Sequence, residues 1–327
     1  MSQFRPLFRN PHLATLAGNF WPRKFDTSGY DSSSVEYQTE PGVRILVEED
    51  RPRAASRGEV LLQHGLEGSS RSGYLVSLAH ALCAAGFTVH RVNMRGCGGS
   101  EPLSASLYHS GLTHDLLFLL NHLQAAGRGP RFLCGFSLGG NVALKLAGEL
   151  AARGPALLSA VAAVSTPIDL ASCVRLLDQP SNWIYQQKFV RSLKARYRRR
   201  HNSFPDRFPL DGLGRIRTIF QFDDAITAPA FGFGTAGNYY ATQSAAQFIP
   251  RITVPTLLVQ AINDPLIPFE IFRSPAVQSN PNVELLAVPY GGHLGFLARG
   301  PSRFWLDLIL TEWISGRVRN KPADCPV

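Results

Sequence analysis

The sequence predicts an α/β fold with a mostly parallel sheet and an inserted helical lid. Short apolar runs that fit strands alternate with amphipathic helical patterns from residue 59 to residue 165. This alternation is typical of βαβ units, whose strands pair in parallel. The alternation stops after Thr166 and resumes at Val254. The intervening residues, 167–250, are too many for a loop and too irregular for sheet units, so we expect them to form a lid.

The first part of the chain predicts an arm and a hairpin. Residues 1–33 show little periodicity but contain several aromatic side chains, so we expect an arm that packs on the core. Residues 33–39 and 44–48 alternate in polarity around Pro41-Gly42, which predicts a β-hairpin. The predicted core comprises residues 34–166 and 251–327.

The remaining elements follow from apolar periodicity and from glycine or proline stops. In the first core helix, for example, Leu75, Leu78 and Leu82 share one face, and Gly86 ends the helix. The predicted strands are 59–63, 87–93, 131–134, 159–165, 254–260 and 283–288. The predicted helices are 74–85, 113–125, 141–150, 182–201, 269–272 and 303–315.

Composition indicates a basic globular protein. The chain has 327 residues and a formal net charge of +9, which permits attraction to nucleic acid, anionic membrane surfaces or acidic substrates. The densest basic run, residues 188–201, lacks the regular aromatic interleaving of a nucleic-acid surface. We therefore expect a helix whose charges mostly face water, and no nucleic-acid partner.

The cysteines and the N-terminus predict a cytoplasmic protein. The five cysteines are odd in number, widely spaced and without zinc-ligand spacing, which indicates a reducing compartment; they are Cys83, Cys97, Cys134, Cys173 and Cys325. The N-terminus lacks a signal-peptide pattern, and no apolar run is long enough to span a bilayer. Peripheral membrane contact and the oligomeric state stay open.

The segment Gly135-Phe136-Ser137-Leu138-Gly139 predicts a nucleophile elbow, because a strand precedes it and a helix follows it. The serine in such a turn has a strained backbone, and the two glycines remove collisions with the crossing chain. The helix N-terminus behind Ser137 directs its free N–H groups towards a reacting oxygen. The alternative is an ordinary glycine-rich turn with an incidental serine.

A serine nucleophile requires a histidine base and a carboxylate that orients this base. In elbow enzymes the chain order is Ser, acid, His. His293 follows the last core strand between glycines, and Asp264 follows the strand at 254–260. We therefore predict His293 as the base and Asp264 as the acid, with Asp169, which follows the preceding strand, as the alternative acid.

The loop after the first core strand, His64-Gly65-Leu66-Glu67-Gly68, is expected to supply part of an oxyanion hole. The predicted donors are the backbone N–H groups of Leu66 and Leu138. We expect His64 to form structural hydrogen bonds rather than to act as a second base, and Glu67 to be solvated rather than to act as a gate residue. We expect capping and packing roles for His109, His114 and Asp115.

These motifs together resemble the YheT-type (embryogenesis-associated) branch of the α/β-hydrolase superfamily. The segments that carry the resemblance are 10–16, 64–68, 95–100, 135–141, 222–229 and 291–296. The resemblance implies an α/β-hydrolase fold: a mostly parallel eight-stranded sheet with helices on both faces and a lid. It also implies carboxylic-ester hydrolysis by Ser137, Asp264 and His293. Eukaryotic members carry a membrane anchor, which we do not expect here, and include enzymes that act on phospholipids.

The leading prediction is a serine ester hydrolase that forms an acyl-enzyme and accepts short to medium acyl chains. The alternatives on the same triad are acyl transfer to an alcohol and hydrolysis directed at lipids or phospholipids. A non-catalytic binding module fits less well, because binding does not require all three triad residues. We expect no cofactor and no metal, since no metal-ligand cluster is visible and the glycines at 96, 98 and 99 lack dinucleotide-binding spacing.

Overall fold

An eight-stranded sheet organises the computed structural model, which describes residues 3–300 and 302–319. The strands lie in the order β1-β2-β4-β3-β5-β6-β7-β8. The β1–β2 and β2–β4 pairs are antiparallel, and every pair from β4 to β8 is parallel. The strands are β1 Tyr30–Glu40, β2 Val43–Pro52, β3 Glu59–Gln63, β4 Thr88–Val92, β5 Arg131–Phe136, β6 Ala160–Val164, β7 Thr256–Ala261 and β8 Val283–Val288. The predicted fold class is confirmed.

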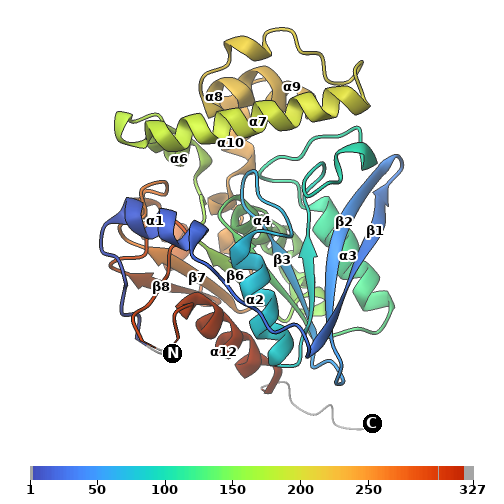
Figure 1. Cartoon of the computed structure of the whole chain (residues 1–327), viewed down its shortest axis with the longest axis vertical. Helices are drawn as coiled ribbons and strands as arrows, with labels where there is room; N and C mark the ends of the chain where they lie inside the picture. Colours follow the sequence, from blue (N-terminus) through green and yellow to red (C-terminus); the bar gives the residue numbers. More distant parts are fainter. Residues whose placement is uncertain (1–2, 301, 320–327) are drawn as a thin grey trace.

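Helices cover both faces of this sheet, which explains why every residue of β3, β4 and β6 is buried. On one face α2 and α12 pack together, and on the other α3 and α4 lie against the strands (Figure 1). The α-helices of the core are α2 Gly73–Ala84, α3 His114–Ala125, α4 Leu138–Leu150, α5 Gly154–Leu157, α11 Pro275–Gln278 and α12 Trp305–Arg319. Short 3-10 turns join them: η1 Glu101–Leu103, η2 Ala151–Arg153 and η8 Phe269–Arg273.

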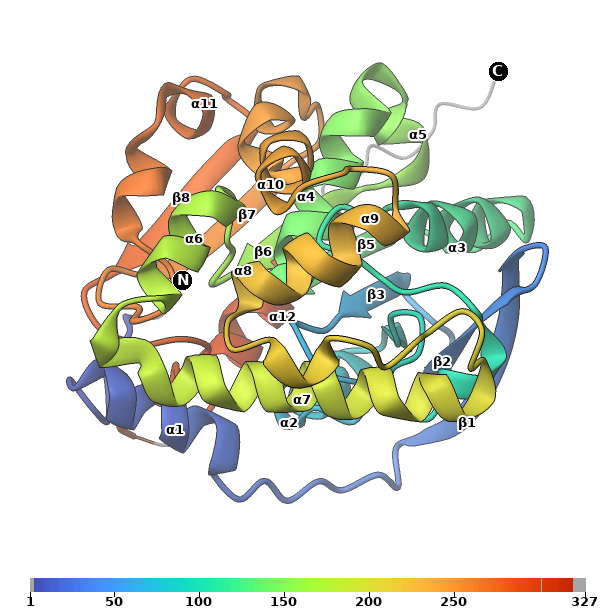
Figure 2. The ribbon, with the colours of Figure 1, turned by 90° about the horizontal axis from the view of Figure 1, so that it is seen from above.

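The segment between β6 and β7 is helical and lies above the sheet (Figure 1). Seen from above, α7 crosses the molecule beside α8 and α9 (Figure 2). Its α-helices are α6 Leu170–Leu177, α7 Trp183–Ser203, α8 Ile219–Phe222, α9 Ala228–Ala230 and α10 Ala236–Gln243. Its shorter turns are η3 Pro180–Asn182, η4 Leu213–Arg215, the π-helical η5 Asp223–Thr227, η6 Ala245–Gln247 and η7 Ile249–Arg251.

The N-terminal arm contains a helix that its weak periodicity did not reveal, α1 Pro11–Phe20. Its start is nevertheless encoded locally. The Asn10 side chain accepts hydrogen bonds from the N–H groups of His12 and Leu13, and Pro11 occupies the first helical position. The predicted hairpin is also longer than expected, and the helix predicted at 269–272 is a 3-10 turn.

Two further observations concern the described residues only. The cysteines at 83, 97, 134 and 173 are free and buried, whereas Cys325 lies outside the described residues. No helix within residues 3–300 and 302–319 has the length and apolar character needed to cross a membrane.

Candidate active site

The turn between β5 and α4 holds Ser137 in a left-handed backbone conformation, with φ 52° and ψ −123°. This conformation is strained for a residue with a side chain. A Cβ atom on Gly135 would overlap the backbone of Gly139, and one on Gly139 would overlap the carbonyl oxygens of Gln63 and His64. Glycine at both positions is therefore what allows the chain to cross so closely.

Three side chains from separate loops meet at this turn. The Oγ atom of Ser137 lies 3.0 Å from Nε2 of His293, and Nδ1 of His293 lies 3.0 and 3.3 Å from the carboxylate oxygens of Asp264. The ionised Asp264 can only accept, so Nδ1 carries the proton and Nε2 presents its lone pair to the serine. This is the tautomer that a general base requires.

The carboxylate of Asp264 is fully buried and held in place by its own loop. It accepts hydrogen bonds from the N–H groups of Leu266 (2.9 Å) and Ile267 (3.2 Å) and from Nε2 of Gln260 (3.3 Å). Asp169 instead caps α6 by accepting from the N–H and the hydroxyl of Ser172. Of the two predicted acids, only Asp264 contacts His293.

The loop that carries His293 is fixed by α1, a contact that the sequence did not predict. The N–H of His293 donates to Oγ1 of Thr15 at 2.9 Å. Gly292 has φ 57°, and a Cβ atom there would overlap Pro11 O and the Thr15 hydroxyl. The backbones of Gly18 and Gly295 are equally close, because a Cβ atom on Gly18 would lie 2.5 Å from the Cα atom of Gly295. The N-terminal arm therefore forms part of the wall behind the histidine.

The loop after β3 lies against Ser137, as a Cβ atom on Gly65 would lie only 2.9 Å from the Cβ of Ser137. Leu66 and Leu138, the predicted oxyanion donors, line the same pocket as Ser137. His64 holds this loop from behind: Nδ1 lies 2.7 Å from Gly65 O, and Nε2 accepts from the N–H of Met94 at 3.1 Å. Complete burial lowers the pKa of His64 to about 4, so this histidine is neutral.

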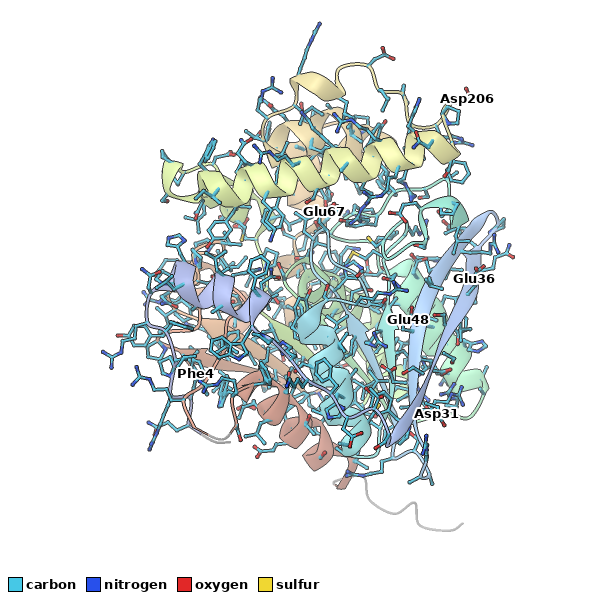
Figure 3. All side chains as sticks on the ribbon, in the orientation of Figure 1. Phe4, Asp31, Glu36, Glu48, Glu67 and Asp206 are labelled. Atoms are coloured by element: carbon cyan, nitrogen blue, oxygen red, sulfur yellow. The ribbon has the colours of Figure 1, made fainter. Side chains whose placement is uncertain are left out.

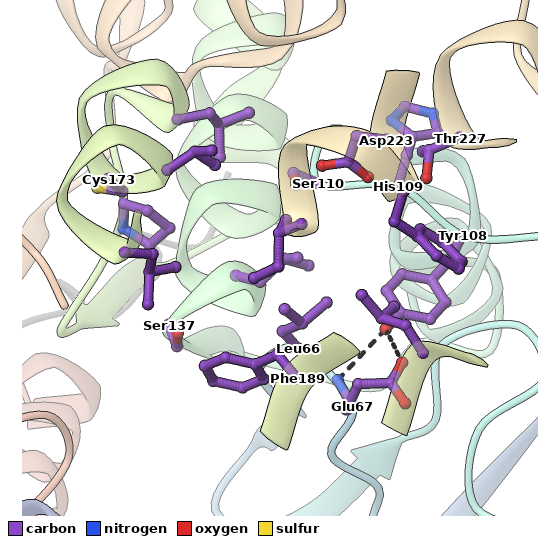
Figure 4. A pocket seen from close by; sticks show the side chains of 18 of the residues that line it. Leu66, Glu67, Tyr108, His109, Ser110, Ser137, Cys173, Phe189, Asp223 and Thr227 are labelled. Carbon is purple, nitrogen blue, oxygen red and sulfur yellow. Dashed lines mark hydrogen bonds between the residues drawn. The ribbon is translucent and has the colours of Figure 1, made fainter. Parts of the chain in front are cut away.

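The pocket above Ser137 is mainly apolar and is roofed by the helical insertion (Figure 4). Phe189 of α7 and Cys173 of α6 reach into it in the same view as Ser137. The apolar side chains that line it include Leu170, Val174, Leu177, Leu193, Ile219, Phe222, Leu266 and Ile267. Charged side chains line another part of the same pocket, among them Glu67, Arg196 and Arg200.

Comparisons with known proteins identify the family of this chain. A family model described as the alpha/beta hydrolase fold matches residues 59–299. The chain belongs to this family. A putative esterase from Escherichia coli K12, YheT, is 31% identical over 328 residues, which cover 98% of this chain and 95% of that protein. The predicted YheT-type branch is confirmed.

Two more distant relatives extend the comparison. Mouse phospholipase ABHD3 is 29% identical over 271 residues, which cover 82% of this chain and 66% of that protein. An esterase structure from Pyrococcus furiosus has a TM-score of 0.60 at 18% identity, covering 92% of this chain and 97% of that chain, and shows a common fold. The family match and the Escherichia coli relative together identify the chain as a carboxylic ester hydrolase.

Within this hydrolase, Glu67 differs from its prediction. We expected a solvated carboxylate, but its side chain is buried and lies 3.2 Å from Nη2 of Arg196 on α7. The hydroxyl of Tyr108 donates to the Glu67 carboxylate at 3.0 Å and accepts from the Glu67 N–H at 3.3 Å (Figure 4). Figure 3 shows Glu67 beneath α7, whereas Glu36 lies at the outer edge of β1. Burial raises the pKa of Glu67 despite the neighbouring guanidinium.

The basic run on α7 also differs in part from its prediction. Lys188, Arg191, Arg198 and Arg199 are exposed, as expected. Arg196 and Arg200 are instead buried and line the pocket. They are four residues apart, so both project from the face of α7 that turns towards the core. Arg200 donates to the backbone carbonyl of Ser104 at 3.0 Å.

Of the three residues for which we predicted capping or packing, Asp115 and His114 form hydrogen bonds within the fold, and His109 packs beside the pocket that it also lines. Asp115 does not cap α3 but forms a buried pair with Arg95, with two N···O distances of 2.8 Å. His114 lies 3.0 Å from Thr39 O. His109 packs against the ring of Phe231, and burial lowers its pKa to about 3. Within residues 3–300 and 302–319, no group of three or more His, Cys, Asp or Glu side chains is arranged to hold a metal ion.

Proposed function

We propose that this hydrolase cleaves carboxylic esters through an acyl-enzyme on Ser137, with His293 as general base and Asp264 as the residue that orients it. The observation that carries the proposal is the unbroken hydrogen-bonded series from Asp264 through His293 to Ser137, at a strained turn that opens into an apolar pocket. Buried and pre-positioned groups of this kind lose little energy to reorganisation during the reaction.

The first half of the reaction uses the His293 tautomer inferred from its hydrogen-bond partners. Nε2 of His293 takes the proton of Ser137 as Oγ bonds to the ester carbonyl carbon, and the carbonyl oxygen becomes an oxyanion. The N–H groups of Leu66 and Leu138 would donate to this oxygen at the N-terminus of α4, whose dipole favours negative charge. The imidazolium is stabilised by Asp264 and returns its proton to the alcohol as the C–O bond breaks.

The second half repeats these steps with water. Nε2 of His293 takes a proton from a water molecule, whose oxygen attacks the acyl carbon, and Ser137 leaves with the proton. The carboxylic acid product then dissociates. We propose that residues 167–250 act as the lid and that the apolar pocket accepts uncharged esters with short to medium acyl chains.

Active-site labelling tests the proposal directly. A fluorophosphonate should modify Ser137 alone, as located by mass spectrometry, and Ser137→Ala should lower kcat by several powers of ten, towards the roughly million-fold loss seen for a triad serine elsewhere. A matched control is Ser34→Ala, because the Ser34 hydroxyl donates to the Glu48 carboxylate on the β1–β2 hairpin, away from the pocket. Labelling elsewhere, or full activity of Ser137→Ala, would refute the assignment.

A lipid-directed activity is the second candidate, favoured by the apolar pocket and by the relative named as a phospholipase. A panel of p-nitrophenyl esters of increasing acyl length, measured beside short-chain and long-chain phospholipids, separates the two candidates. Product analysis with added ethanol separates hydrolysis from acyl transfer, because transfer yields an ethyl ester in place of the free acid.

A further inference from the structure

Helix α1 exposes its apolar side chains and buries its small ones. The face that packs on the histidine loop consists of Ala14, Thr15 and Gly18. Leu13, Leu16 and Phe20 face outward, and Phe20 is 70% exposed. A surface helix normally turns its apolar stripe towards the core. The close glycine contacts explain the small inner residues, but they do not explain the large apolar residues on the outside.

The first turn of α7 continues this apolar surface. Trp183 and Ile184 are 60% and 70% exposed. The two helices lie side by side, because the ring of His12 stacks on Tyr185 with centroids 5.7 Å apart, and Nζ of Lys188 lies 5.6 Å from the centroid of Phe20. Both views show α1 beside the first half of α7 (Figures 1 and 2). We call Leu13, Leu16, Phe20, Trp183 and Ile184 the α1–α7 patch.

Basic side chains predominate near this patch, although Asp178 lines a groove together with Trp183 and Arg217. Arg9 and Lys24 flank α1 in the sequence, and Lys188 and Arg191 follow Ile184 on the same face of α7; all four are exposed. Neither α1 nor α7 contains an acidic residue, and the sequence from residue 3 to residue 25 contains none. Apolar side chains with an excess of basic side chains beside them match the acyl region and the headgroups of an anionic bilayer.

We propose that the α1–α7 patch docks this protein on an anionic lipid bilayer surface. Phe20, Trp183 and Ile184 enter the boundary between headgroups and acyl chains, and Lys188 and Arg191 remain at headgroup level, where long basic side chains place their charges. Docking also places the active site near the bilayer. Thr15, on the opposite side of α1, holds the N–H of His293, so the bilayer lies about one helix diameter, roughly 10 Å, from the histidine loop.

The test is flotation of the full chain with vesicles of phosphatidylcholine alone and with one-third phosphatidylglycerol. We expect binding to the anionic vesicles that weakens as salt rises, because each basic residue near the surface contributes roughly fivefold to the partition coefficient at low salt. Phe20→Ser combined with Ile184→Ser should lower the partition coefficient at least about tenfold. The matched control is Leu210→Ser, an exposed leucine beyond the other end of α7, which should leave it unchanged.

The experiment separates docking from catalysis. Ser137→Ala should bind vesicles like the wild type, and the double patch variant should hydrolyse a water-soluble p-nitrophenyl ester at the wild-type rate. Tryptophan fluorescence should be quenched by brominated lipid in the wild type and less in Trp183→Phe. Equal binding by the patch variant and the wild type, or no preference for anionic vesicles, would overturn the proposal. The proposal would also be overturned if the wild type formed a concentration-dependent dimer but did not bind vesicles, and the patch variant did not dimerise. The patch would then be a self-association surface.

Discussion

Acidification should destabilise the fold through His64. The folded protein holds the neutral imidazole, because Nε2 accepts from the N–H of Met94 and a proton there would face another donor. The pKa of His64 is lowered from 6.5 to about 4, whereas the unfolded chain keeps a value near 6.5. Below pH 6.5 the unfolded state therefore binds one proton more than the folded state, and stability falls as the pH decreases.

The size of the effect follows from the difference between these two pKa values. At about 1.4 kcal/mol per pH unit, the free energy of unfolding should lose about 2 kcal/mol by pH 5 and about 3 kcal/mol by pH 4, with no contribution above pH 6.5. His64→Gln removes the titrating group but keeps an acceptor for the Met94 N–H. The variant should be less stable than the wild type at pH 8, and this difference should shrink by about 2 kcal/mol at pH 5.

Urea unfolding followed by tryptophan fluorescence at several pH values between 8 and 5 measures this difference. Leu82→Ala is the control, since it removes a fully buried side chain that does not titrate, and its loss of about 2–5 kcal/mol should not change with pH. If the stability difference between wild type and His64→Gln stayed constant within about 0.5 kcal/mol from pH 8 to pH 5, the inferred neutral state of His64 would be wrong.

Four further predictions concern the active site and its surroundings. Asp264→Asn should lower kcat by about 10⁴-fold and Asp169→Asn by much less, and a larger loss for the Asp169 variant would reverse the assignment. Arg196→Met should lower the free energy of unfolding by about 3–5 kcal/mol in urea titrations, because the Glu67 carboxylate stays buried without its cation, and adding Glu67→Gln should recover most of the loss. Gly139→Ala should lower the free energy of unfolding by about 1–3 kcal/mol or more in the same assay. Gly214→Ala should leave it unchanged, because a Cβ atom there meets no atom within 4 Å, and equal losses for the two variants would contradict the close backbone contact at the elbow. For a neutral soluble ester, kcat/KM should change less than about twofold between 0.1 and 1 M salt, a range over which the Debye length falls from about 10 to about 3 Å. A steep fall of kcat/KM would mean that the basic run at residues 188–201 acts at the active site.

The sequence was informative wherever a feature depends on neighbours along the chain. The elbow requires only a strand, two glycines and a helix start, so the spacing of Gly135, Ser137 and Gly139 was enough to predict this turn. The positions of Asp264 and His293 followed from chain order, because the carboxyl ends of parallel strands meet at one edge of the sheet. The alternation of strands and helices likewise predicted the core.

Features that depend on contacts between distant segments escaped prediction. Burial of Glu67 and Arg196 is decided by where α7 crosses the loop after β3, and neither local sequence shows that crossing. Thr15 is one residue in an arm of weak periodicity, and only the fold brings it to His293. The Asn10-Pro11 start of α1 was a usable signal for that helix, but its packing partner was not encoded nearby.

The hydrogen bond between Thr15 and His293 joins residues 278 positions apart, and this separation bears on how the enzyme matures during synthesis. Domains form from the N-terminus as a chain leaves the ribosome at about 5–20 residues per second. Nearly the whole chain must therefore be synthesised before Thr15 can form its hydrogen bond with His293. His293 follows β8, the last strand, so a nascent chain can complete the sheet before the N–H of His293 emerges and reaches Thr15.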